Sequence, residues 1–324
     1  MSLEILWFML IAFLWTGFLF LEGFDFGVGI LQLFLGKNER ERRTYISSIS
    51  PHWDGNEVWL LTACAAMFAA FPSWYASFFS ALYLPFVFLL LALIVRGVSF
   101  EFRHRANFSS ARIACDIALA AGSLVSALLI GIAMANLVIG IPIENGNFTG
   151  TFSALVKPYA LFGGVLGLSL FLTNGALFLS LKIEGELKER AQSFAKVSVM
   201  VSVILFAIAT VLAWEHSLIC IVPFVLILLA AILVFKRFSK IAFIFVGLCT
   251  ACSVAALFYT MFPNVLISSI PEHSLTVFNS ASSEYTLKIM SIIAAIFFPV
   301  TLAHQIWSYY VFRKRISPRN TMEV

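Results

Sequence analysis

Charge is scarce in this sequence. Charged residues make up only 12% of its 324 residues, apolar residues make up 61%, and the mean hydropathy is +0.96. Soluble domains carry about twice that share of charge, so a soluble fold is excluded. Repeated apolar runs long enough to cross a bilayer predict an all-α integral membrane protein that spans the membrane several times.

Motifs of the common cofactor-binding folds are also missing. The chain has no GxGxxG turn after a strand, no P-loop, no CxxCH for attached haem and no repeated arginine within a span. Its five cysteines lie in or beside apolar runs, and the CxxC pair Cys249 and Cys252 lacks the flanking context of a metal or redox site. We therefore expect no metal site and no catalytic residue in this chain alone.

Nine apolar segments, separated by polar breaks, predict nine transmembrane helices. No connection between them is long enough to form a separate soluble domain. The predicted helices cover residues 5–35, 52–71, 76–103, 111–140, 157–181, 193–213, 218–235, 240–263 and 285–312.

Lysine and arginine fall on alternate connections. Of the 21 basic residues, 18 lie on one set of connections, and the other set contains none. This asymmetry predicts an extracytoplasmic N-terminus, a cytoplasmic C-terminus and an odd number of spans. The net charge of +4 therefore reports orientation and does not indicate a nucleic-acid partner. Tryptophans at the predicted ends fit an aromatic belt: Trp7, Trp74 and Trp214 outside, and Trp53 and Trp59 inside.

The first and fifth segments share a faint pattern, FLFLEGFDFG against LFLTNGALFL. It suggests two four-helix units, residues 1–140 and 141–263, followed by an outer loop, a ninth helix and a basic cytoplasmic tail in residues 264–324. Only the first unit carries the acidic pattern, since Asn174 stands where the first unit has Glu22. Any chemistry is therefore expected in the first unit.

Four acidic residues lie within or at the mouth of apolar segments. Glu22 and Asp25 fall inside the first segment, and Asp54 and Glu57 open the second. Such residues cost several kcal/mol in hydrocarbon, so they usually face the protein interior and serve function. Asp25 is about 15 Å from the inner end of its helix at 1.5 Å per residue, and Glu22 lies about one turn farther out on the same face.

Two interpretations of these acids remain open. Arg96, at a similar depth in the third segment, could pair with Glu22 and Asp25 and hold the helices together, or the acids could carry protons while partly paired. Ser50 as N-cap and Pro51 as first helical residue would start the second helix, in which case Asp54 could simply compensate the helix dipole.

Two histidines qualify for special roles. His52, at the cytoplasmic boundary, could pass protons inward, although a solvated interfacial histidine is the favoured interpretation. His304 lies deep in the last segment, where a hydrogen-bonded structural role is favoured over haem ligation.

Three long motifs resemble subunit II of the cytochrome bd-type quinol oxidases, including the cyanide-insensitive branch. They are EGFDFGVGILQLFLGKNERERR (22–43), ISPHWDGNEVWLLTACAAMFAAFPSWYA (49–76) and ALIVRGVSFEFRHR (92–105), in the order and spacing of that family. Glu57, where relatives often have Gln, and the shorter chain are departures from the pattern.

The resemblance implies a subunit of a quinol oxidase in the bacterial cytoplasmic membrane. It implies haems b and d in subunit I and none ligated here, a bound quinone in some members, and contacts with lipid, quinol and a small single-helix accessory subunit. Asp25 and Asp54 match family acids on a cytoplasmic proton path, and Arg96 and Glu101 match a polar pair of the third helix. The expected proton-path residues are Asp25, Asp54, Glu22, Glu57, Glu101 and His52, with Arg96 as charge partner.

Two other functions compete with this one. A proton- or ion-coupled secondary transporter would also carry acids and glycine breaks at mid-membrane, but its second half should be polar too. A purely structural scaffold for a haem-bearing partner would need no titrating acid.

Overall fold

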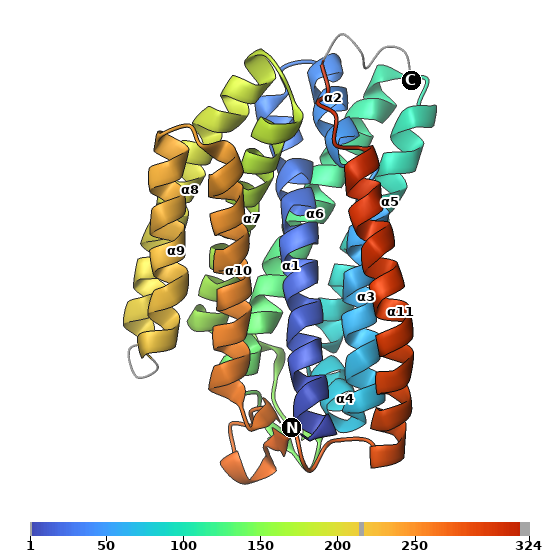
Figure 1. Cartoon of the computed structure of the whole chain (residues 1–324), viewed down its shortest axis with the longest axis vertical. Helices are drawn as coiled ribbons and strands as arrows, with labels where there is room; N and C mark the ends of the chain where they lie inside the picture. The colour runs from blue at the N-terminus through green and yellow to red at the C-terminus, as the bar shows by residue number, and fades with distance from the viewer. Residues whose placement is uncertain (1, 214–216, 318–324) are drawn as a thin grey trace.

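The computed structural model describes residues 2–213 and 217–317. Trp214, which the sequence assigned to an outer end, and residues 318–324 of the expected basic tail lie outside the described residues. The described chain is a bundle of long helices with α1 (Leu3–Leu35) at its centre (Figure 1).

The helices follow one another up and down the bundle (Figure 1). Alpha-1 begins at one end, and α11 finishes at the other. After α1 come α2 (Glu39–Ile49), α3 (Trp53–Ala70), α4 (Pro72–Ala81), α5 (Tyr83–Arg105), α6 (Ser109–Ile139), α7 (Pro158–Lys182), α8 (Glu186–Leu212), α9 (Ser217–Phe235), α10 (Ser239–Met261) and α11 (Glu284–Val311).

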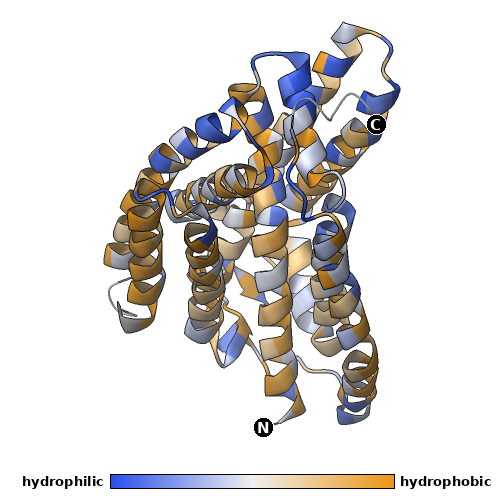
Figure 2. Ribbon diagram, turned by 45° about the horizontal axis from the view of Figure 1, so that its top comes forward, coloured by the Kyte–Doolittle hydropathy of each residue, from blue (hydrophilic) through white to orange (hydrophobic). Residues whose placement is uncertain are grey.

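Each of the nine expected segments contains one of these helices. Seven of them are long and apolar enough to cross a membrane: α1, α5, α6, α7, α8, α10 and α11. Alpha-9 is a shorter apolar helix, and α3 has 18 residues with polar groups in its first turns. Hydrophilic residues gather at the end of the bundle that carries α2 and the C-terminal segment, and hydrophobic residues cover its middle (Figure 2).

Two helices were missed in the sequence. The basic connection after α1 folds into α2, whose N-cap Asn38 accepts a hydrogen bond from the Glu41 amide. The expected helix start at Ser50 was wrong, because Ser50 caps the C-terminus of α2, and α3 begins only at Trp53. The third expected span is likewise divided, with the ten-residue α4 preceding α5.

Alpha-1 is the axis of the packing, with α3, α6, α7 and α10 around it. Its closest approach is to α7, where a Cβ added to Gly175 would lie 2.7 Å from the Cα of Gly27. Two small residues thus let the two backbones touch, as in other membrane helix pairs. This crossing joins the two predicted four-helix units, so α1 belongs to the core of both.

The end of the bundle opposite α2 is closed by two short hairpins (Figure 1). Strands β1 (Ile143–Glu144) and β2 (Asn147–Phe148) pair antiparallel, and so do β3 (Asn264–Leu266) and β4 (Leu275–Thr276). A bridge between Ile141 and Ser268 connects the two loops, which fixes the ends of α6 and α10 next to each other.

Candidate functional site

A buried ion pair joins α1 to α5. Arg96 Nη1 lies 2.6 Å from Glu22 Oε1, and both side chains are fully buried. The Arg96 guanidinium also lies over aromatic rings, 5.0 Å from the centroid of Phe26 and 5.5 Å from that of Phe100. The ion pair expected from the sequence is therefore formed, and rings, rather than water, cover the rest of the cation.

Asp25 interacts with this arginine electrostatically but forms no ion pair with it among the described residues. Its Oδ2 accepts a 2.6 Å hydrogen bond from the amide Nδ2 of Asn56 on α3. The Asn56 Oδ1 accepts in turn from Tyr309 OH at 2.8 Å and from Gln305 Nε2 at 3.0 Å. A chain of neutral hydrogen bonds thus runs from the last helix to a fully buried carboxyl group.

The remaining acids lie progressively closer to the surface. Glu57 Oε2 is 3.8 Å from Arg96 Nη1, and the Glu57 side chain is 23% exposed. Asp54, one turn earlier on α3, and Glu101, near the end of α5, are exposed on the surface of this chain and lie close enough to interact electrostatically. The ion pairs of Arg96 are with Glu22 and Glu57.

His52 is not solvated, contrary to the favoured expectation. It is only 3% exposed, and its ring stacks on Tyr309 with the centroids 4.2 Å apart and the planes 5° from parallel. It therefore covers the hydrogen-bonded chain of Tyr309 and Asn56. His304 is exposed on α11 beside Trp307, so the structural hydrogen bond expected for it is absent from the described contacts.

A second polar cluster secures α2 against the bundle. The fully buried Asp116 on α6 accepts hydrogen bonds from Arg42 Nε at 2.8 Å and from Arg103 Nε at 2.5 Å. Gln32 of α1 donates to the Asp116 backbone carbonyl at 2.7 Å. Since each oxygen of the Asp116 carboxylate accepts from an arginine, this acid binds helices α2, α5 and α6 together.

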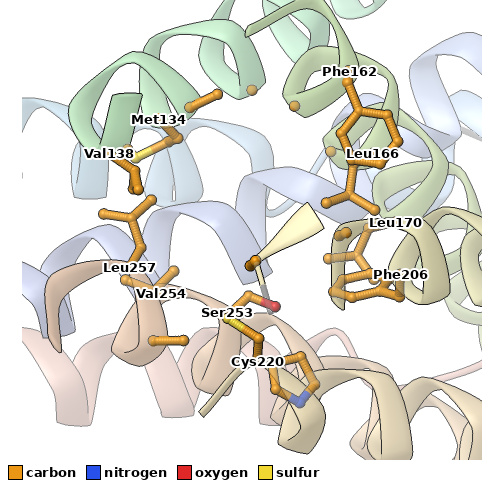
Figure 3. A pocket seen from close by; sticks show the side chains of 18 of the residues that line it. Met134, Val138, Phe162, Leu166, Leu170, Phe206, Cys220, Ser253, Val254 and Leu257 are labelled. Carbon is orange, nitrogen blue, oxygen red and sulfur yellow. The ribbon is translucent and has the colours of Figure 1, made fainter. Parts of the chain in front are cut away.

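A large apolar cavity of about 780 Å³ lies between α6, α7, α8, α9 and α10. Met134, Phe162, Leu166, Phe206 and Leu257 point into it (Figure 3). Two of its hydroxyl groups, on Thr210 and Ser253, donate to carbonyls of their own helix backbones. A cavity of this size and lining suits a hydrophobic chain or ring. Among the described residues, no group of three or more His, Cys, Asp and Glu could hold a metal ion.

Comparison with known proteins identifies the family. The family model of cytochrome bd terminal oxidase subunit II matches residues 3–312. The chain belongs to this family. As a subunit II, it is part of an oxidoreductase complex and a multi-pass protein of the bacterial inner membrane.

Individual relatives of this subunit II cover nearly the whole chain. The cytochrome bd ubiquinol oxidase subunit 2 of Bacillus subtilis is 40% identical, covering 99% of each chain. The cytochrome bd-I ubiquinol oxidase subunit 2 of Escherichia coli is 33% identical, over 97% of this chain and 95% of the relative. A chain of the bd oxidase structure from Geobacillus thermodenitrificans has the same fold, with a TM-score of 0.77 at 18% identity and coverage of 96% and 97%.

Sequence reasoning missed the neutral half of the site in this subunit II. Asn56, Gln305 and Tyr309 complete the surroundings of Asp25, and two of them come from α11, about 250 positions along the chain. The sequence did contain a signal for these residues, because the second and the ninth apolar segments each carry an amide side chain. Asn56 lies beside Glu57, and Gln305 lies beside His304. Both amides stood next to residues that seemed more reactive.

Proposed function

We propose that this chain packs against the haem-bearing subunit I and carries protons from the cytoplasm toward the site of dioxygen reduction. One observation carries the proposal: Asp25 is a fully buried carboxyl whose hydrogen-bond partner is a neutral amide. A carboxylate hydrogen-bonded to a neutral amide is costly at that depth, so a group that gains and loses a proton is the economical explanation.

The acids differ in how exposed their side chains are, and this order supports a proton path from the surface to the buried acids. Asp54 is exposed, Glu57 is partly exposed, and Glu22 and Asp25 are fully buried. Protons would thus pass from Asp54, with Glu101 beside it, to Glu57 and then to the buried acids. Arg96 forms its ion pair with Glu22, whereas the hydrogen-bond partner of Asp25 is the Asn56 amide. His52 supports the path by covering Tyr309 rather than by collecting protons from water.

Packing against subunit I is supported by the acidic and apolar side chains exposed along α3, α5 and α11. Only Leu287 is buried among the 28 residues of α11, and α11 runs beside α3 at one edge of the bundle (Figure 1). Asp54 on α3 and Glu101 on α5 would contact lipid if that face were uncovered, which carboxylates do not tolerate. We infer that subunit I covers the face formed by α3, α5 and α11 and receives protons there.

Nine spans and a cytoplasmic C-terminus are part of the proposal. Alpha-3 and α9 would complete the nine, since α3 has 18 residues and α9 has 19. The alternation of basic connections supports an outer N-terminus. A membrane-impermeant thiol reagent should label Asn145→Cys only from the outside and Lys314→Cys only from the cytoplasm; labelling from the opposite sides would reverse the orientation.

The haems b and d are assigned to subunit I, as the family implies. The 780 Å³ cavity of this chain suits a bound quinone better than a haem, because none of its lining residues is a histidine. The division into units 1–140, 141–263 and 264–324 remains a proposal, with α11 now contributing to the site of the first unit. A small single-helix accessory subunit is an additional expected partner.

The test compares two variants of the purified complex, each of which lacks one carboxylate. Asp25→Asn should abolish most quinol-dependent oxygen consumption while preserving the reduced-minus-oxidised haem spectrum. Glu189→Gln, an exposed acid of α8, should leave both unchanged. Full activity of Asp25→Asn would support the purely structural scaffold instead, and solute transport by this chain alone in liposomes would support the transporter.

A further inference from the structure

A second cavity, of about 380 Å³, lies at the basic end of the bundle. It opens between the start of α8, the turn from α9 to α10, and the segment after α11. Four basic residues line it: Lys188, Arg237, Lys240 and Arg315. The proton-path acids lie on α1, α3 and α5, none of which lines this cavity, so the cavity is a separate site.

These basic residues have no carboxylate partner within the part of the chain that the structure describes. Glu186, in the first turn of α8, pairs instead with Lys37 and Arg190. Arg315 donates through Nε to the Leu181 carbonyl at 3.2 Å, which fixes its guanidinium at the cavity. The cavity therefore concentrates positive charge that an anion would compensate.

The first turn of α10 adds backbone donors to the same cavity. Ser239, Lys240 and Ile241 begin this 23-residue helix and all line the cavity. No side chain caps the helix start among the described contacts, so its first N–H groups remain available. Free N–H groups at a helix N-terminus favour phosphate-like anions, and the lysine and arginine side chains supply the charge.

Arg237 occupies an unusual backbone position. Its φ of +63° lies in the left-handed region, at the C′ position that ends α9. Its N–H bonds to the Val234 carbonyl, and the Phe238 N–H bonds to the Leu233 carbonyl, which is the Schellman arrangement. Glycine is the usual residue there, so an arginine at this position calls for a reason beyond the turn itself.

The rim of the cavity is apolar. Phe238 is 54% exposed and Ile241 is 45% exposed, and both lie next to the basic residues. A ligand for this site therefore has a phosphate at one end and hydrocarbon at the other. We propose that the cavity binds the phosphate of an anionic phospholipid in the leaflet next to the basic connections. This proposal rests on the membrane location of the chain and not on the proton path.

The experiment titrates short-chain lipids into the delipidated oxidase complex and counts bound molecules by native mass spectrometry. The probes are dioctanoylphosphatidylglycerol, dioctanoylphosphatidylcholine and inorganic phosphate. Phosphatidylglycerol should bind at this site more tightly than the other two. Equal binding of the zwitterionic lipid, or displacement by inorganic phosphate at the same concentration, would overturn the assignment to an anionic lipid.

Matched variants locate the site. Lys188→Gln combined with Arg237→Gly and Lys240→Gln should weaken phosphatidylglycerol binding about a hundredfold, since each basic residue near a lipid surface contributes about fivefold. The control removes three other exposed basic residues of the same end of the bundle and should not weaken this binding. Equal loss in both variants would contradict the proposed site. The control changes are Arg105→Gln, Lys236→Gln and Lys314→Gln.

Arg237→Gly separates binding from structure. Glycine fits the left-handed backbone, so the thermal stability of the lipid-free complex should stay the same or rise while affinity for phosphatidylglycerol falls about fivefold. A loss of stability together with unchanged affinity would mean that Arg237 serves the turn alone, and would contradict its role in binding.

Discussion

Replacing Arg96 would show how much the buried ion pair contributes to the free energy of unfolding. Arg96→Met keeps the bulk of the side chain but leaves Glu22 fully buried without its cation at 2.6 Å. Breaking a buried pair by removing one partner costs about 3–5 kcal/mol, because the remaining charge is uncompensated. Glu57 at 3.8 Å would also lose its attraction, which places the expected loss at the upper end of that range.

The assay is a double-mutant cycle on the purified complex. Unfolding is followed by circular dichroism across a titration with denaturing detergent, for Arg96→Met, Glu22→Leu and the double variant. Replacing both partners by apolar residues is often close to neutral, so the double variant should be more stable than Arg96→Met alone. The coupling energy should amount to about 3 kcal/mol.

A surface pair provides the control. Lys37 and Glu186 lie 3.7 Å apart, and both side chains are 70% exposed, so Lys37→Met should cost less than about 1 kcal/mol. The reasoning is refuted if Arg96→Met costs no more than Lys37→Met. That result would mean that Glu22 is protonated in the native protein and that the two groups do not form an ion pair.

Three further changes follow from the packing and the surface ion pairs. Asp116→Asn should destabilise the chain by about 3 kcal/mol, because two arginines lose their carboxylate, and trypsin should then cleave faster within residues 36–52. Gly175→Ala should cost about 1–3 kcal/mol in the same unfolding assay, because its Cβ would approach α1 to 2.7 Å, whereas Gly167→Ala, with 3.6 Å of clearance, should not destabilise. The hydrogen bond from Arg190 holds the pKa of Glu41 below its ordinary value of 4.5. The pair therefore stabilises the fold above pH 4.5, and this stabilisation is lost as the pH falls through the lowered pKa of Glu41. The difference in unfolding temperature between wild type and Glu41→Gln should accordingly disappear in acid.

Most of the architecture could be predicted from the sequence, because apolar length and charge asymmetry are local signals. The nine expected segments all contain helices, and the all-helical class is confirmed by the structure. The missed helix α2 is amphipathic and highly charged, with Arg42 and Tyr45 contacting the bundle, so hydropathy gave no indication of it.

The site was predicted only in its charged half. An acid or an arginine in an apolar segment is easy to recognise, because burying its charge costs free energy. Glu22 and Arg96 do form the expected pair. The partner of Asp25 could not be predicted, because Asn56 carries no charge and its other partners come from α11. Such a contact depends on how the last helix packs against α3, which no local pattern in the sequence specifies.

Proton uptake by the reconstituted complex tests the central claim most directly. The oxidase is placed in liposomes with its cytoplasmic face outward, reduced, and given a pulse of oxygen while a dye follows the external pH. The account predicts that Asp25→Asn slows proton uptake and oxygen reduction by about a hundredfold, with an unchanged haem spectrum. Uptake at the wild-type rate in Asp25→Asn would contradict it.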